Sequence, residues 1–474
     1  MTIKFYNTLT RVKEEFVPIE KDKVKLYTCG PTVYNFVHIG NLRTYVFQDI
    51  LRRYLRFRGL TVRQVMNLTD VDDKTIRDSI KEGTSLSEFT KRYSNAFIAD
   101  LNTLNIEHPE VMCSATKHIK EMIDLIKKLM DKGIAYKGTD DSIYFNIAKY
   151  KEYGKLSKVD LSQLKAGARV SHDEYEKESL ADFALWKAWD NNDGDVFWET
   201  ELGKGRPGWH IECSAMSMKY LGEHFDIHTG GVDLRFPHHE NEIAQSEAAS
   251  EKKFANYWLH AEHLLVNGKK MSKSLGNFYT LRDILKKIKN PMAIRYLLLS
   301  TNYRQQLNFT FESLEGAENS LERMKNFMIK LNESIEEDNT LDRNDYVETL
   351  LNELKDKFID SMDDDLNICE ALASIFNFIN EINKIVELPS IDAKEILERF
   401  QHLDHVLGVL HEDEIVLDDE IDSLLKQREE ARKVKNFEEA DIIRKRIENA
   451  GYVIEDTGKG ARVKRKSKNY TKSL

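Results

Sequence analysis

The sequence predicts an α/β protein: a parallel-sheet domain with an insertion, then an α-helical bundle and a small C-terminal module. Three patterns predict it. Residues 24–74 alternate strand-like and helix-like runs, short strand-like pieces rich in tyrosine interrupt this rhythm later, and the chain after residue 311 is almost continuously helical. We place the domains at 1–310, 311–410 and 411–474, with the insertion at about 110–205 and a polar-loop region at 266–310.

The composition is that of a soluble globular protein, with 41% hydrophobic and 32% charged residues. No apolar run is long enough to span a membrane, and MTIKFYNTLT at the N-terminus lacks an apolar signal segment, so we expect a cytoplasmic protein. The four cysteines are too few and too scattered for a disulfide framework, which leaves metal binding or simple burial. The net charge of −10 argues against a nucleic-acid partner bound by the whole surface, although a local basic surface remains possible.

The first predicted helix, about residues 42–58, follows a predicted strand at 24–28 through a short polar turn. The tetrad HIGN lies at this junction, where free backbone N–H groups and the helix dipole favour an anionic ligand such as a phosphate. His38 and Asn41 can donate hydrogen bonds to developing charge, and Gly40 lets a flat ligand approach the backbone. Taken alone, the tetrad fits an ordinary loop with a hydrogen-bonded histidine at least as well.

A second polar loop, VNGKKMSKSLGNF, carries Lys270 and Lys273. Two lysines three residues apart, among serines and glycines, suit a loop that folds over a polyphosphate and neutralises its charge. The alternative is a solvated basic loop. HIGN followed by KMSKS, in that order, resembles the paired signature of class I aminoacyl-tRNA synthetases, which implies a Rossmann-type catalytic domain that binds ATP.

Two further predicted helices carry possible metal ligands. His238 and Glu242 are four residues apart on one helix face, and Cys213 lies on the helix predicted at 208–221. These three side chains could hold one metal ion, and Cys29 beside the HIGN turn is the candidate for a fourth ligand. Spacing alone is only suggestive, because a buried cysteine is usually inert and the adjacent histidines could lie on the surface.

The segments YTCGPTVY, GWHIECSAM and DIHTGGVDLRFPHHENEIAQSE, together with the two signatures, resemble the cysteinyl-tRNA synthetase family along essentially the whole chain. The resemblance implies an enzyme that activates cysteine with ATP, as its Mg²⁺ complex, and transfers the cysteinyl group to the 3′ end of tRNA(Cys). It also implies a monomer with one Zn²⁺ per chain. The zinc ligands it implies are Cys29, Cys213, His238 and Glu242. Since zinc would distinguish a thiol from the hydroxyl of serine, we expect no separate editing domain.

The same resemblance implies roles for other residues. His38 and Asn41 would stabilise the reacting phosphate, and Lys270 and Lys273 would draw pyrophosphate away. The ATP-binding residues it implies are His38, Gly40, Asn41, Gly230, Gly231 and Lys273. The cysteine-binding candidates are Thr69, Trp209, His228 and Asp233. The family often has histidine where this chain has Asn41, and an amide can donate a hydrogen bond but cannot carry charge.

The C-terminal third resembles the tRNA-binding parts of such enzymes. Residues 363–383 resemble a bundle domain found in several class I synthetases, and the module at 411–474 looks like one that reads the cysteine anticodon. From residue 459 onward its tail has basic residues and no acidic ones. Such a tail is either a solvated end or a contact for RNA phosphates.

Three rival functions are weaker. A ligase that joins cysteine to an amino sugar, on the same scaffold, would have no use for the bundle and the terminal module. A zinc-dependent nucleic-acid-binding protein without catalysis would not need both HIGN and KMSKS. A dehydrogenase would rest only on GKGRPG at residues 203–208, where Pro207 removes a backbone N–H that the dinucleotide-binding turn needs.

Overall fold

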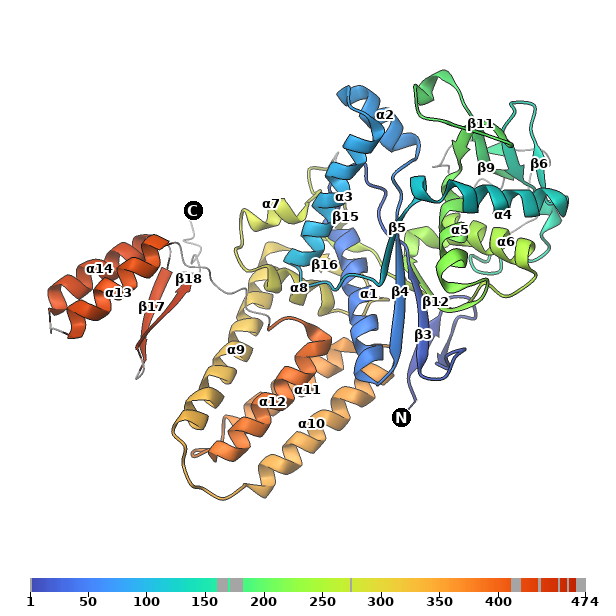
Figure 1. Cartoon of the computed structure of the whole chain (residues 1–474). Helices are drawn as coiled ribbons and strands as arrows, with labels where there is room; N and C mark the ends of the chain where they lie inside the picture. Colours follow the sequence, from blue (N-terminus) through green and yellow to red (C-terminus); the bar gives the residue numbers. More distant parts are fainter. Residues whose placement is uncertain are drawn as a thin grey trace. The chain divides into compact units, whose positions relative to one another are not determined.

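The computed structural model describes residues 2–159, 169–170, 182–272, 275–410, 419–433, 436–450, 452–457 and 460–465 (Figure 1). They form two compact units, Met1–Leu410 and His411–Leu474. The predicted phosphate-binding residue Lys273 lies outside the described residues, as do residues 466–474 of the basic tail.

A five-stranded parallel sheet forms the centre of the first unit, as the sequence predicted. Its strands are β3 (Lys23–Thr28), β4 (Thr61–Leu68), β5 (Val111–Ser114), β12 (Phe225–Gly231) and β13 (Ala255–Ala261). Their order is β5-β4-β3-β12-β13, so the direction of strand addition reverses between β3 and β12. Open α/β sheets bind ligands at such a reversal, outside the carboxyl ends of the strands. The residues that follow β3 and β12 are therefore the first place to look for a site.

The helices α1 (Ile39–Phe57) and α5 (Trp209–Leu221) pack against this sheet (Figure 1). The other helices of this part of the chain are α2 (Asp73–Glu82), α3 (Leu86–Thr103), α4 (Ile119–Asp131) and α6 (His238–Ser250). The apolar face predicted for the first helix is buried, because its apolar positions recur with helical spacing. The strand β4 ends at Leu68, and α2 begins five residues later at Asp73. The Asp72 side chain accepts the N–H of Thr75, and this cap starts α2.

The insertion is a separate, largely antiparallel sheet. Its strands are β6 (Ala135–Lys137), β7 (Ile143–Phe145), β8 (Arg169–Val170), β9 (Asp182–Ala188), β10 (Trp198–Thr200) and β11 (Gly203–Pro207). It begins at Ala135, later than the expected start near residue 110. The difference arises because β5 pairs with β4 in the parallel sheet and α4 packs against α5 and α6. A four-residue strand is too short to show a period in the sequence.

The rest of the first unit leads from the sheet into a bundle. After β13 come β14 (Leu264–Val266), β15 (Lys269–Lys270), α7 (Leu281–Leu285), α8 (Pro291–Leu299) and β16 (Leu307–Phe309). The bundle contains α9 (Phe311–Glu336), α10 (Asp345–Asp363), α11 (Ile368–Ile382) and α12 (Ser390–Leu407). The hairpin of β1 (Lys4–Asn7) and β2 (Val12–Glu15) precedes the sheet. One hydrophobic core runs from α1 through α8 into the bundle.

The second unit is small. The helices α13 (Asp419–Lys433) and α14 (Phe437–Asn449) pack against each other through Ile421, Leu424, Ile443 and Ile447. The strands β17 (Tyr452–Thr457) and β18 (Gly460–Arg465) form an antiparallel pair. Within the described residues of the whole chain, no helix combines the length and the apolar character needed to cross a membrane.

Candidate functional site

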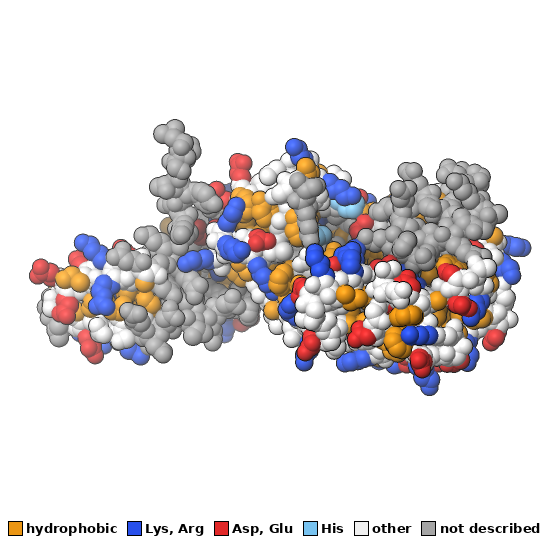
Figure 2. Space-filling model, turned by 90° about the horizontal axis from the view of Figure 1, so that it is seen from above, with side chains coloured by type: hydrophobic (Ala, Val, Ile, Leu, Met, Phe, Trp, Pro, Cys, Tyr) orange, Lys and Arg blue, Asp and Glu red, His pale blue; other side chains and the backbone are white. Residues whose placement is uncertain are grey.

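A cleft of about 600 Å³ opens beside the strand-order reversal. Of the residues singled out from the sequence, it is lined by Cys29, His38, Gly40, Asn41, Trp209, Gly231, Asp233, His238 and Lys270. In Figure 2, which looks onto the molecule from above the view of Figure 1, histidine side chains reach the surface near lysine or arginine side chains. The structure thus gathers residues from distant parts of the chain around one cleft.

The HIGN turn starts α1 through a reciprocal pair of hydrogen bonds. The N–H of Asn41 donates to Nδ1 of His38 at 3.1 Å, and the N–H of His38 donates to Oδ1 of Asn41 at 3.2 Å. Burial lowers the pKa of His38 to about 4, so the ring is neutral near pH 7. Because Nδ1 accepts a bond, Nε2 carries the proton, and Nδ2 of Asn41 remains as a second donor. The turn therefore offers two neutral N–H donors.

The three predicted glycines differ in what they allow. At Gly40 a Cβ would lie 3.0 Å from the ring of His38, so glycine lets this ring fold back over the helix start. Gly231 lines the cleft, and a Cβ there would lie 2.5 Å from Oδ1 of Asp233. Gly230 is not among the residues that line the cleft, so its role in ATP binding stays a prediction. Its Cβ position is 2.7 Å from the ring of His239, so glycine is needed there to seat that ring.

The four predicted metal ligands come together below the cleft. Cys29 follows β3, Cys213 lies on α5, and His238 and Glu242 lie on α6. All four are buried, and one ligand atom from each lies within 4.8 Å of the others. Nε2 of His238 is 3.1 Å from a carboxylate oxygen of Glu242. Elements separated by most of the first unit's sequence thus meet at one point.

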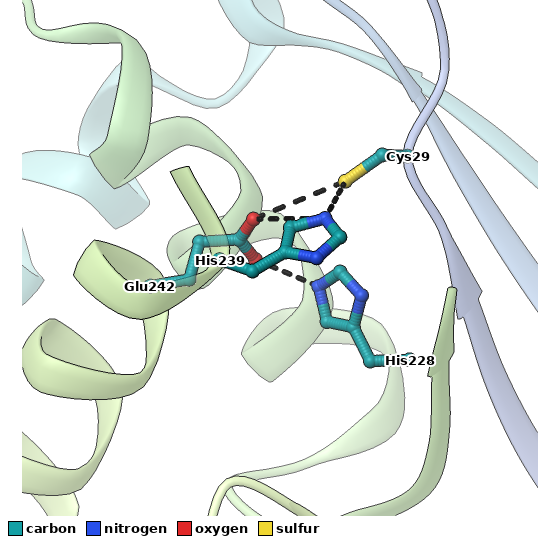
Figure 3. Close-up of side chains that lie close together, drawn as sticks. All are labelled: Cys29, His228, His239 and Glu242. Carbon is teal, nitrogen blue, oxygen red and sulfur yellow. Dashed lines mark hydrogen bonds and ion pairs between the residues drawn. The ribbon is translucent and has the colours of Figure 1, made fainter. Parts of the chain in front are cut away.

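A second set of possible ligands shares two of these residues. Cys29 and Glu242 also lie close to His228 of β12 and His239 of α6, and these four side chains point toward one another (Figure 3). Nε2 of His239 is 3.3 Å from Sγ of Cys29, and Nε2 of His228 is 2.8 Å from Oε2 of Glu242. The sequence analysis missed His239, so the structure leaves two ligand sets to compare.

The first set fits a zinc site better. Cys29 and His238 line the cleft, whereas His228 and His239 do not. The second ring nitrogen of the histidines does not separate the sets, because Nδ1 of His239 lies 2.8 Å from Nε2 of His260 and Nδ1 of His238 lies 3.0 Å from Nδ1 of His210. The first set also offers two thiols, and soft sulfur ligands favour zinc. His228 bonds to Glu242 and His239 to Cys29, which are the contacts expected of residues that orient metal ligands.

The charges in the first set also suit a cation. Burial and the neighbouring Cys213 raise the pKa of Cys29 well above its usual range. In Cys213 burial is outweighed by hydrogen bonds from Cys29 and His238, and the pKa falls to about 6. In Glu242 burial is outweighed by His228 and His238, and the pKa falls to about 2. Glu242 and Cys213 in turn outweigh burial at His238 and raise its pKa to about 10. The cluster thus pairs a thiolate and a carboxylate with the His238 imidazolium, whose proton a divalent cation would displace on binding.

Only half of the cysteine-binding candidates reach the cleft. Trp209 lines it, and its ring stacks on that of His238 at 4.3 Å between centroids. Asp233 lines it from the turn after β12. Thr69 instead donates its hydroxyl to Glu212 at 2.8 Å, and neither Thr69 nor His228 lines the cleft. A substrate in the cleft would contact the first pair directly.

Helix α6 also carries buried polar residues that no sequence pattern singled out. Glu240 accepts the N–H groups of Gly154, Leu156 and Ser157 from the insertion, and the Tyr153 hydroxyl donates to Asn241 at 2.5 Å. Most of this polar helix is buried. A helix that is polar on every face and lies between apolar strands is a sequence signal for such a buried network.

Family comparisons agree with this geometry. A family profile described as "tRNA synthetases class I (C) catalytic domain" matches residues 15–319. A DALR domain profile matches residues 357–411, and a "Cysteinyl-tRNA ligase anticodon binding domain" profile matches residues 416–463.

Curated relatives match the chain along nearly its full length. The cysteine–tRNA ligase of Chlamydia muridarum is 50% identical, covering 98% of this chain and 100% of the relative. That of Protochlamydia amoebophila is also 50% identical, with 98% of each chain covered. That of Brachyspira hyodysenteriae is 48% identical, covering 98% of this chain and 99% of the relative.

Solved structures share the fold at low identity. Methionyl-tRNA synthetase of Mycobacterium tuberculosis in complex with methionyl-adenylate has a TM-score of 0.60 and 14% identity, over 82% of this chain and 90% of that one. A LeuRS–tRNA–LeuAMS complex of Agrobacterium radiobacter has a TM-score of 0.62 and 11% identity, over 83% and 85%.

Proposed function

The chain belongs to the cysteine–tRNA ligase family of class I synthetases, and from this premise we propose how its side chains divide the reaction. It is an ATP-dependent ligase (EC 6.1.1.16) that joins cysteine to tRNA(Cys). The observation that carries the proposal is the single cleft that brings the HIGN turn and Lys270 together with the buried thiol cluster.

In the first step the carboxylate of cysteine attacks the α-phosphate of ATP, and the bond to the leaving pyrophosphate breaks. We place the α-phosphate against Nε2–H of His38 and Nδ2–H of Asn41, because both residues line the cleft and these two N–H groups are not used in the bonds that start α1. Both are held by the helix start itself, so little reorganisation is needed when charge develops.

Lys270 and Lys273 act on the leaving group in this proposal. Lys270 is exposed at the cleft on the short strand β15, and a flexible cation there can follow pyrophosphate as it departs. Lys273 is assigned by family resemblance. Mg²⁺ accompanies ATP as substrate. We keep Gly40, Gly230 and Gly231 as the glycines that leave room for the adenosine; Gly40 and Gly231 line the cleft, and Gly230 is the neighbour of Gly231 in β12.

We propose that zinc is held by Cys29, Cys213, His238 and Glu242. A zinc ion at this point would supply a soft Lewis-acidic centre that favours the sulfur of cysteine over the oxygen of serine. Cys29 and His238 line the cleft, so the cluster is reachable by a substrate side chain. Trp209 walls that side, since it stacks on His238.

Asp233 is our candidate for the α-ammonium group of cysteine. It is the acidic member of the cysteine-binding candidates that lines the cleft, and a carboxylate accepts hydrogen bonds from an ammonium. Thr69 and His228 act indirectly in this proposal. Thr69 bonds to Glu212 on α5, and His228 bonds to Glu242 on α6.

The second step transfers the cysteinyl group to the terminal ribose of tRNA, by family resemblance to its 2′-hydroxyl. We propose that residues 1–310 catalyse both steps, that the bundle at 311–410 supports the tRNA, and that residues 411–474 read the anticodon with help from the basic tail. We further propose a cytoplasmic monomer. The profile matches at 357–411 and 416–463 favour tRNA over an amino sugar as the acceptor.

The test is cysteine-dependent ATP–pyrophosphate exchange, followed by charging of tRNA(Cys), with metal content measured on the same preparation. We expect exchange with cysteine, at least about 100-fold weaker exchange with serine, and about one zinc per chain. Folded, zinc-loaded protein that exchanges with both amino acids alike would refute the selection by zinc. Exchange without tRNA charging would instead refute the acceptor.

A further inference from the structure

Arg43 is a buried arginine that the reaction described above does not use. It lies on α1, two residues after Asn41, and is only 2% exposed. An arginine is expensive to bury unless its N–H groups are satisfied. The hydrogen-bond partners of the Arg43 guanidinium therefore indicate why an arginine is buried at this position.

The Arg43 guanidinium donates to four backbone carbonyls in two separate segments. Nη1 donates to the carbonyls of Glu262 at 2.7 Å and His263 at 3.0 Å. Nη2 donates to the carbonyls of Asn302 at 3.2 Å and Gln305. These four carbonyls lie outside the strands, so strand pairing does not supply their hydrogen bonds. The guanidinium supplies those hydrogen bonds instead.

The first of these segments forms part of the cleft. Residues 261–264 line it and then enter β14. In the pairing of β14 with β15, Leu265 lies opposite Lys270. A short path of backbone therefore connects the Arg43 guanidinium to the lysine proposed to act on pyrophosphate. The same helix carries His38 at its cap and Asn41 in its first turn.

The second segment connects to the bundle. The N–H of Glu262 donates to the carbonyl of Tyr303 at 2.7 Å, which joins the two segments directly. The Tyr303 hydroxyl and Nε of Arg304 both donate to the Asp365 carboxylate at 2.6 Å. Asp365 lies between α10 and α11. The cleft wall is thus tied to the loop that joins two helices of the bundle.

We propose that Arg43 is a positioning residue for the activation step. It fixes the cleft wall at 261–264, and through β14 the strand that carries Lys270, against the start of α1. His38 and Lys270 then face one phosphate chain at a set separation. This proposal rests on the proposed roles of His38 and Lys270 in ATP activation.

The test compares two buried arginines. In Arg43→Lys the ammonium cannot span both segments, because its three donors radiate from one point. The matched control is Arg295→Lys. Arg295 is fully buried and donates to the carbonyls of Leu104, Asn105 and Leu407 and to the Asp49 carboxylate at 2.6 Å, and it is not among the described residues that line the cleft.

We expect both variants to melt at lower temperature. Only Arg43→Lys should lower kcat/KM for ATP in cysteine-dependent exchange, by about 10- to 100-fold, while the KM for cysteine and the zinc content stay within about twofold. Equal kinetic effects of the two variants, or a change in the KM for cysteine as large as that for ATP, would overturn the proposal. A wild-type protein without exchange would instead count against the proposed function.

If Arg43→Lys does not fold, hydrogen exchange of the unmodified protein provides the test. The amides of residues 262–266 and 303–305 should exchange in the same cooperative step as the first turn of α1. Independent opening of residues 262–266 would overturn the proposal.

Discussion

The two sides of the cleft are built differently. On the thiol side, Cys29, Cys213, His238 and Glu242 are at most 4% exposed and are anchored in β3, α5 and α6. On the phosphate side, Lys270 is exposed on a two-residue strand. Distinguishing sulfur from oxygen requires fixed distances, whereas neutralising a departing pyrophosphate requires a cation that can move with it. The difference in burial therefore matches the difference in task.

The largest expected effect is on the thiol side. Cys213→Ser should release zinc and lower cysteine-dependent exchange by more than about 1000-fold, because it removes a ligand from a buried cluster. Cys113→Ser is the matched control: Cys113 is also a buried cysteine of this core, it donates to the carbonyl of Met66, and it belongs to neither ligand set found among the described residues. Metal analysis and exchange assays on both variants check this. Equal losses of zinc and of exchange activity in the two variants would mean that any substitution of a buried cysteine in this core disturbs the site, and that Cys213 is not a specific ligand.

Lys270→Ala should have the next largest effect. We expect kcat for exchange to fall about 100-fold with zinc content unchanged, since the variant removes charge stabilisation and leaves the thiol side intact. Lys269→Ala, its exposed neighbour on β15, does not line the cleft and should stay within about twofold of wild type. Zinc loss from Lys270→Ala would show that the two sides are not independent.

His239→Asn separates the two ligand sets. If His239 only supports Cys29, the variant should bind zinc about 10-fold more weakly and still be fully active when zinc is in excess. Competition with a chromophoric chelator measures the affinity. Loss of zinc as complete as in Cys213→Ser would mean that the histidine-rich set holds the metal.

The smallest expected effect is on the pH dependence of the free energy of unfolding, to which His38 on the phosphate side contributes. Burial lowers the pKa of His38 to about 4, below the value of about 6.5 in an unfolded chain, so the unfolded state takes up more protons between these values. His38 therefore lowers the free energy of unfolding as the pH falls from about 6.5 to 4, by at most about 3 kcal/mol.

His38→Gln should make the loss of stability over this pH range shallower in urea titrations, whereas the surface variant His108→Gln should not. An unchanged slope for His38→Gln would show that the ring is protonated in the folded protein.

The sequence was most informative where the spacing of apolar residues and the motifs of polar residues pointed to the same fold. The βα rhythm of residues 24–74 predicted the parallel sheet. HIGN and KMSKS indicated a class I synthetase that binds ATP, and the segments around Cys29, Cys213 and His238 indicated the ligase family. The four proposed ligands lie far apart along the chain, yet a family resemblance was enough to name a set that the fold does bring together. The ligand set itself stays a prediction.

The sequence was least informative where packing decides. Gly230 is a glycine because His239 packs over it, and no local pattern distinguishes that reason from contact with a ligand. The adjacent residues His238 and His239 face different neighbours: His238 lines the cleft, and His239 contacts His260. The rotation of α6 about its own axis decides this, and the sequence does not reveal that rotation. Likewise β5 is too short for its sequence to show the alternation that would have predicted a strand at the edge of the sheet.

X-ray absorption at the zinc edge, on zinc-loaded protein without substrate, tests the central claim most directly. If Cys29 and Cys213 both bind the metal beside His238 and Glu242, the spectrum will show two sulfur neighbours at about 2.3 Å and lighter neighbours at about 2.0–2.2 Å. A single sulfur neighbour would contradict this ligand set and support Cys29, His228, His239 and Glu242 instead.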